Sequence, residues 1–161
     1  MSLGDSVFLF GARRVLLVLH AGAAIVLIGA ATHHALQMRH YLRGDFRRVA
    51  LEKTYAKVIS VAYVITFVLG AMVYPSYRVQ VRGLYLDRYA PAYSGLFDMK
   101  EVYASLTLTI AVGLGALAIT LRPAESPALA RVYAMMSLLV CAVVWFDVIA
   151  GLLITSVRGL G

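Results

Sequence analysis

The chain has 161 residues, of which 61% are hydrophobic and only 14% are charged, and its formal net charge is +7. A mean hydropathy of +0.82 lies well above that of an ordinary soluble domain, which excludes a water-soluble enzyme. It also excludes a soluble nucleic-acid-binding module, the class of protein that a positive net charge would otherwise suggest. The lysines and arginines instead cluster at the ends of long apolar runs, where lipid phosphates lie. The composition therefore predicts an integral membrane protein.

Four apolar runs are each long enough to cross a bilayer, which requires about 20 residues of helix. They predict helices at about 14–38, 55–77, 100–121 and 131–157. The runs lack the alternation of apolar and polar residues that is typical of a membrane β-barrel. Short connections after the first and third helices make neighbouring helices antiparallel. The expected fold is an all-α, integral membrane four-helix bundle that forms a single domain over residues 1–161.

The segment between the second and third helices, residues 78–99, is rich in aromatic residues. Tyr85, Tyr89, Tyr93 and Phe97 recur every four residues, which places them on one stripe of a helix that Pro91 either starts or breaks. Aromatic side chains gather at bilayer interfaces, so the segment is interpreted as an aromatic interfacial loop. The alternative is a cap over a cofactor or substrate near that surface.

The distribution of basic residues bears on orientation. The fifteen lysines and arginines divide almost equally between the two sides of the bundle, but those around the first helix do not. Arg13 and Arg14 precede that helix, whereas the connection after it carries Arg39, Arg43, Arg47, Arg48, Lys53 and Lys57. Positive residues favour the cytoplasmic side. The chain is therefore expected in the cell membrane, the inner membrane of a prokaryote, with its first loop in the cytoplasm.

All four histidines, His20, His33, His34 and His40, lie in or just after the first helix. Ionisable groups at membrane depth are costly and so are functional hypotheses by default. Fourteen residues separate His20 from His34, which puts them within roughly 40° of one another and about 21 Å apart along the axis, while His33 points elsewhere. Their shared face is lined by small or flexible residues, namely Ala23, Ala24, Leu27, Ala30, Ala31 and Met38.

Two imidazoles near opposite membrane surfaces, beside small residues, are what two stacked b-type haems require as axial ligands. The pattern resembles the ligand-bearing helices of di-haem membrane cytochromes b, in which two histidines on one helix stand at this separation. It implies haem b, in one or two copies, bound by His20 and His34. Arginines at the span ends are candidates to hold the haem propionates: Arg13, Arg14, Arg39 and Arg78.

The other three helices contain no histidine, so a second imidazole would come from a partner chain. A homodimer that pairs the first helix with its copy supplies one, and Gly22 and Gly29 on the opposite face suit close packing against a sister helix. The alternatives are a five-coordinate iron or another axial ligand within the chain: Met72, Met99, Met135, Met136, Lys100 or Cys141.

A second resemblance runs further along the chain. His20, the cluster His33-His34 with His40, the basic stretch 51–57 and Asp98-Met99-Lys100 look like the four-helix bacterial protoporphyrinogen oxidase and copper-resistance membrane families. This resemblance implies haem-related or metal chemistry, with His20 as the early ligand and Lys100 as the basic residue of the third helix. Imidazole and thioether groups also suit copper, so a copper site at His33, His34, Met38 and His40 is the alternative.

Asp147 is the carboxylate placed deepest in the apolar runs. It is a candidate proton relay or quinone-site acid, a partner for a histidine or for a deep lysine such as Lys57, or else a protonated acid bonded to a neighbouring helix. Lys100 is a further candidate for a proton-relay or interhelical polar role. The sequence therefore predicts a membrane haem protein that carries electrons across or within the bilayer and exchanges them with a quinone or redox subunit. The rivals are an oxidoreductase of porphyrinogen or quinol and a non-redox structural or assembly subunit.

Overall fold

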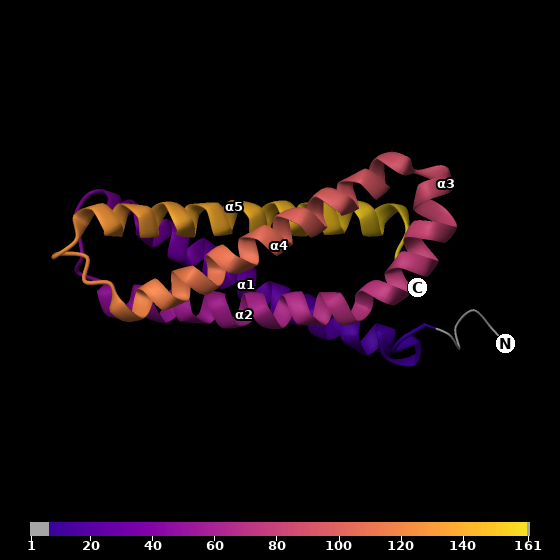
Figure 1. Cartoon of the computed structure of the whole chain (residues 1–161), viewed down its shortest axis with the longest axis horizontal. Coiled ribbons are helices and arrows are strands. Elements are labelled where there is room, and N and C mark those ends of the chain that lie inside the picture. Colours follow the sequence, from indigo (N-terminus) through magenta and orange to yellow (C-terminus); the bar gives the residue numbers. More distant parts are fainter. Residues whose placement is uncertain (1–6, 161) are drawn as a thin grey trace.

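The computed structural model describes residues 7–160, and four long helices dominate this part of the chain (Figure 1). They are α1 (Arg13–Leu42), α2 (Val49–Tyr77), α4 (Pro91–Thr120) and α5 (Pro127–Val157), with a short 3-10 turn η2 (Phe10–Ala12) before α1. Each of the four is long and apolar enough to cross a membrane. The prediction of an all-α four-helix membrane bundle is confirmed.

The helices contact one another in a ring. Helix α1 packs on α2 and α5, and α4 packs on the same two neighbours from the opposite side. Residues 43–48, here called loop one, join the end of α1 to the start of α2. Residues 121–126, here called loop three, join the end of α4 to the start of α5. Both loops lie at the same end of the bundle (Figure 1).

The segment 78–99 differs from the interfacial loop expected from the sequence. It is helical almost throughout: the π-helical segment η3 (Arg78–Leu86) continues α2, the short α3 (Asp87–Tyr89) follows, and α4 begins at Pro91. Proline at the first helical position needs no intrahelical N–H partner, which explains this start. The helices also extend beyond their apolar runs, because polar residues continue a helix once it leaves the hydrocarbon layer.

The aromatic rings of this segment form two groups rather than one stripe. Phe97 stacks on Tyr77 with 4.3 Å between centroids and lies 6.0 Å from Tyr74, whereas Tyr85 and Tyr89 contact each other. Ion pairing adds to these contacts, since Arg82 pairs with Asp98 at 2.5 Å. The segment is therefore a packed helical cap over the end of the bundle opposite loops one and three.

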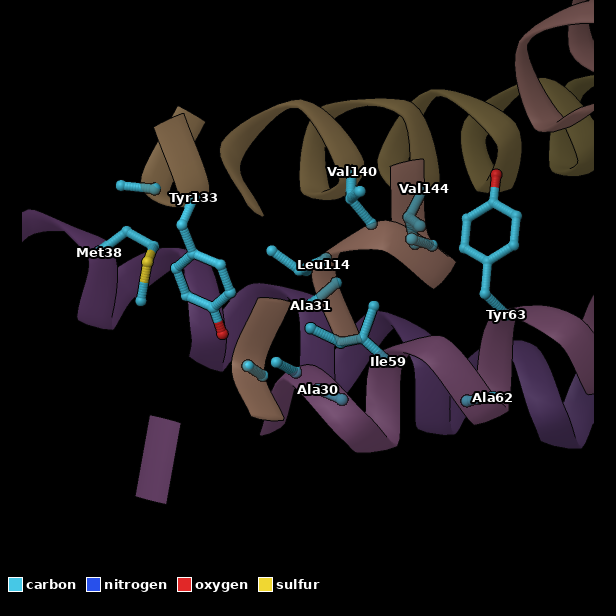
Figure 2. Close-up of a cluster of buried hydrophobic side chains, with 14 of the residues drawn as sticks. Ala30, Ala31, Met38, Ile59, Ala62, Tyr63, Leu114, Tyr133, Val140 and Val144 are labelled. Carbon is cyan, nitrogen blue, oxygen red and sulfur yellow. The ribbon is translucent and has the colours of Figure 1, made fainter. Parts of the chain in front are cut away.

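The interior combines many small side chains with a few large ones, such as Tyr63 and Tyr133 (Figure 2). Alanines such as Ala31, Ala56 and Ala111 are at most 1% exposed, so the helix backbones approach closely. Many other large apolar side chains point outward, and Val18 and Ile25 are each 70% exposed. Only a surrounding apolar phase makes such an exterior favourable, which agrees with a bundle that contacts lipid.

Candidate functional site

The four histidines of α1 occupy four different environments. His33 is exposed and its ring stacks against Tyr55, while His40 lies 3.8 Å from Asp45 at the start of loop one. His34 is fully buried, and His20 is half-buried. Across residues 7–160, no three histidine, cysteine, aspartate or glutamate side chains converge as a metal site would require. The structure thus leaves the copper ligands predicted from the sequence apart from one another.

His34 lies at the centre of a buried hydrogen-bonded network. Its Nε2 is 2.7 Å from Glu52 Oε1 on α2, and its Nδ1 is 2.5 Å from Ser137 Oγ on α5. The Tyr41 hydroxyl donates to Glu52 Oε2 at 2.8 Å, and the Tyr133 hydroxyl lies 3.3 Å from His34 Nε2. We refer to these five residues as the closed network.

Every group in the closed network has a partner. None of its side chains belongs to a residue more than 4% exposed, so the cost of removing them from water is offset by their mutual hydrogen bonds. Met38, which is 0% exposed, packs beside Tyr133 at this end of the core (Figure 2). Both ring nitrogens of His34 are occupied, and neither is free to approach an iron without breaking a bond.

Sequence reasoning missed Glu52 as an interior residue. In the sequence it lies within the basic stretch 51–57 at the start of the second helix, yet it is 1% exposed. A signal was available, because Glu52, Ala56, Ile59 and Tyr63 follow the i, i+4, i+7, i+11 spacing of one helix face, and all four are buried. The helical spacing thus places Glu52 on the same buried face of α2 as these apolar residues.

His20 lies in the other half of the bundle and is held differently. Its Nδ1 is 2.9 Å from the Thr66 carbonyl oxygen of α2, and no partner is recorded for Nε2 within residues 7–160. Gly70, one turn beyond Thr66, leaves space for the ring: a methyl group added there would be 3.1 Å from His20 Cε1. A glycine at this position lets α2 approach the imidazole closely.

One charged side chain, that of Lys100, lies near His20. Lys100 of α4 is close enough for its charge to act on both His20 and Asp147, and its Cε would be 3.7 Å from a methyl group added at Gly151 of α5. Lys57, the lysine that the sequence suggests as a partner for Asp147, is exposed. We refer to His20, Thr66, Lys100 and Asp147 as the open cluster. Three members of this cluster, His20, Lys100 and Asp147, are candidate site residues from the sequence analysis, and Thr66 is not.

The open cluster is incompletely bonded. Within the described chain, Asp147 Oδ1 and Thr66 Oγ1 are buried without a hydrogen-bond partner. Tyr63, on which the charge of Asp147 acts, donates its hydroxyl to the Ala104 carbonyl at 3.1 Å. Buried polar atoms without partners are uncommon in folded proteins, and they mark places where a ligand, ion or water can supply the missing bond.

The four predicted propionate partners divide between the two ends. Arg13, Arg14 and Arg78 lie at the end of the bundle where α1 begins and α2 ends, which is the end nearer His20. The Arg13 guanidinium donates to the Phe10 carbonyl at 3.0 Å, and its Nε is buried without a partner among residues 7–160. Arg39 is exposed at the opposite end, near His34.

No protein-family model, curated protein or solved structure matches the chain.

Proposed function

We propose that the chain is a membrane protein that binds b-type haem through His20 and carries electrons across or within the bilayer. The observation that carries the proposal is the hydrogen bond from His20 to the Thr66 carbonyl oxygen. A ligand histidine almost always donates its second ring N–H to a carbonyl or carboxylate, which fixes the tautomer and directs the other nitrogen to the metal. His20 has this arrangement, and its Nε2 is unpartnered in the described chain.

The proposal assigns one haem to each chain. A second haem at His34 would require that residue to give up either Glu52 or Ser137, each of which bonds one of its nitrogens. Breaking a buried network of this kind leaves several groups unsatisfied at once. His34 is therefore assigned to the interior of the bundle in this proposal, and His20 alone to the iron.

The haem would approach His20 from the half-exposed side of the imidazole. The opposite edge of the ring, at Nδ1 and Cε1, already faces Thr66 and Gly70. One turn further along α1, Ala23 and Ala24 are small and half-buried, which limits steric conflict with a flat macrocycle. Gly22 and Gly29, on the face of α1 away from His20, have open space beside them, so a second copy of α1 could pack against that face in a homodimer.

The residues around His20 have distinct roles in this proposal. The haem supplies a one-electron redox couple, and the protein sets its surroundings. Arg13, Arg14 and Arg78 pair with the propionates, which offsets the cost of carboxylates near lipid. The positive charge of Lys100 and the carboxyl group of Asp147 tune the local electrostatics. A quinone or an attached redox subunit in the cell membrane exchanges the electron, with loop one on the cytoplasmic side.

A reduced-minus-oxidised visible spectrum tests the proposal directly. Protein made with an adequate haem supply is expected to show a Soret band that His20→Ala removes. The matched control is His40→Ala, on the same helix but paired only with Asp45 at the surface, which keeps the band. A wild-type preparation without any Soret band rejects haem binding and leaves a structural or assembly subunit. A band that survives His20→Ala at full occupancy rejects the ligand assignment.

One observation favours an enzyme as the second candidate. The charge of Lys100 acts on His20, and these are the two residues that the resemblance to protoporphyrinogen oxidases selects. A cation beside a haem would suit the binding of an anionic porphyrinogen carboxylate. Turnover of protoporphyrinogen or quinol by purified protein, lost in Lys100→Met with the Soret band retained, would establish the enzyme over the pure electron carrier.

A further inference from the structure

A cavity of about 360 Å³ opens at the loop-one end of the bundle, away from the proposed haem. Three of its lining residues come from the last turns of α1, and the others come from loop one. They are Gln37, His40, Tyr41, Asp45, Arg47 and Arg48. Since α1 and α2 are membrane-crossing helices that end here, the cavity lies at the level of the lipid headgroups.

The charges of the cavity are arranged in two parts. Arg47 donates to both carboxylate oxygens of Asp45, at 3.0 and 2.8 Å, and these bonds lower the pKa of Asp45 to about 2, so the carboxylate is ionised at neutral pH. Arg48 is exposed, and its side chain forms no hydrogen bond or ion pair with any residue in 7–160. Within this part of the chain, the cavity thus offers a free guanidinium together with an ionised carboxylate.

Besides its charged residues, the cavity contains a side-chain oxygen that is unsatisfied within the described chain, Oε1 of Gln37. Its Oε1 is buried and receives no hydrogen bond from any residue in 7–160, although the side chain lines the cavity. Tyr41 cannot satisfy it, because the Tyr41 hydroxyl donates to Glu52. A buried carbonyl oxygen without a donor calls for a ligand that carries N–H or O–H groups.

These features select a particular ligand chemistry. A simple anion would suit Arg48 but would leave Gln37 Oε1 unsatisfied and would face the charge of Asp45. A simple cation would be repelled by both arginines. A zwitterion with a phosphate at one end and a primary ammonium at the other matches all of these groups, because the ammonium donates three hydrogen bonds.

We propose that this cavity binds the headgroup of phosphatidylethanolamine, with the phosphate at Arg48 and the ammonium between Gln37 Oε1 and Asp45. Phosphatidylcholine presents the same charges but has no N–H donor for Gln37. Phosphatidylglycerol has hydroxyl donors but no positive charge to place beside Asp45. The site therefore discriminates among three lipids that share a phosphodiester.

Native mass spectrometry of the detergent-solubilised protein with the three lipids, at equal concentration and with identical acyl chains, tests the site. Wild-type protein is expected to retain phosphatidylethanolamine roughly fivefold over phosphatidylcholine, the factor that one net hydrogen bond contributes. Gln37→Leu should abolish this preference, and Arg48→Gln should lower retention of both lipids. Arg43 is exposed and lies outside the cavity lining, so Arg43→Gln should change neither the preference for phosphatidylethanolamine nor the retention of the two lipids.

A wild-type protein that retains the three lipids equally overturns the proposal, and this result does not depend on whether any variant folds. Equal losses in Arg48→Gln and Arg43→Gln would also overturn it, since they would indicate general attraction between basic residues and phosphate. Soluble phosphoethanolamine provides a further arm: if it displaces the lipid at equal concentration, the site belongs to a free phosphate ester. All of these readouts are independent of haem.

Discussion

The two halves of the bundle differ in whether their buried polar groups have hydrogen-bond partners. In the closed network, near loop one, His34 and Glu52 are enclosed by α1, α2 and α5, and each has its hydrogen bonds. In the open cluster, towards the other end, His20 is bonded through one nitrogen only, and Asp147 Oδ1 and Thr66 Oγ1 lack partners within the described chain. One helix, α1, contributes a histidine to each.

This difference separates stability from function. A fully bonded interior network contributes to the uniqueness of the fold but has no free atom to offer a ligand. An incompletely bonded cluster costs folding free energy, and proteins retain such costs mainly at functional sites. The open cluster is therefore the better candidate for ligand binding, and the closed network the better candidate for holding three helices together.

The largest effect is expected from removing the Glu52 carboxylate. Glu52→Ala leaves His34 and Tyr41 buried without their shared acceptor, and breaking one partner of a buried pair costs about 3–5 kcal/mol. The free energy of unfolding in detergent measures this loss. Glu125→Ala is the matched control, because its pair with Arg122 in loop three is exposed and such pairs contribute less than about 1 kcal/mol. Equal losses in the two variants would show that the closed network does not stabilise the fold.

A smaller effect is expected at Gly115, where α4 packs closely against Ser60 of α2. Gly115 is buried, and a methyl group added there would collide with both Cβ and Oγ of Ser60, which donates to the Ala111 carbonyl. Gly115→Ala should cost about 1–3 kcal/mol of stability, as overpacking usually does. Gly113→Ala, whose methyl would be an ordinary 3.4 Å from Met136 Cε, should be neutral or slightly stabilising. If both variants melt alike, the two helices are not in close contact at Gly115.

The smallest effect is expected from Asp147 in the open cluster. Because its Oδ1 has no partner in the described chain, Asp147→Leu should change the free energy of unfolding by less than about 1 kcal/mol. Asp147→Asn keeps the shape and serves as the control for size. A loss in Asp147→Leu as large as that in Glu52→Ala would mean that this carboxylate, too, belongs to a bonded network, and the contrast between the halves would disappear.

The amino-acid sequence alone determined the architecture. Four long apolar runs can satisfy their backbone groups in lipid only as helices, and the short loops one and three make them antiparallel, so the bundle followed without tertiary information. On the face of α1 that carries His20 and His34, Leu27, Ala30, Ala31, His34 and Met38 are buried in the bundle, whereas His20, Ala23 and Ala24 are half-buried. The helical structure of segment 78–99 was harder to predict from the sequence, because its polar residues are typical of a loop although they continue a helix.

Only the tertiary structure decided what each interior side chain meets. Periodicity fixes the angle of a residue around its own helix axis, but the rotation of the neighbouring helices determines which group faces it. His20 and His34 were therefore equivalent in sequence, whereas packing gave His34 the Glu52 carboxylate and Ser137, and gave His20 a backbone carbonyl and a glycine. The bonding of each histidine depends on contacts between residues up to 103 positions apart, which local patterns do not encode.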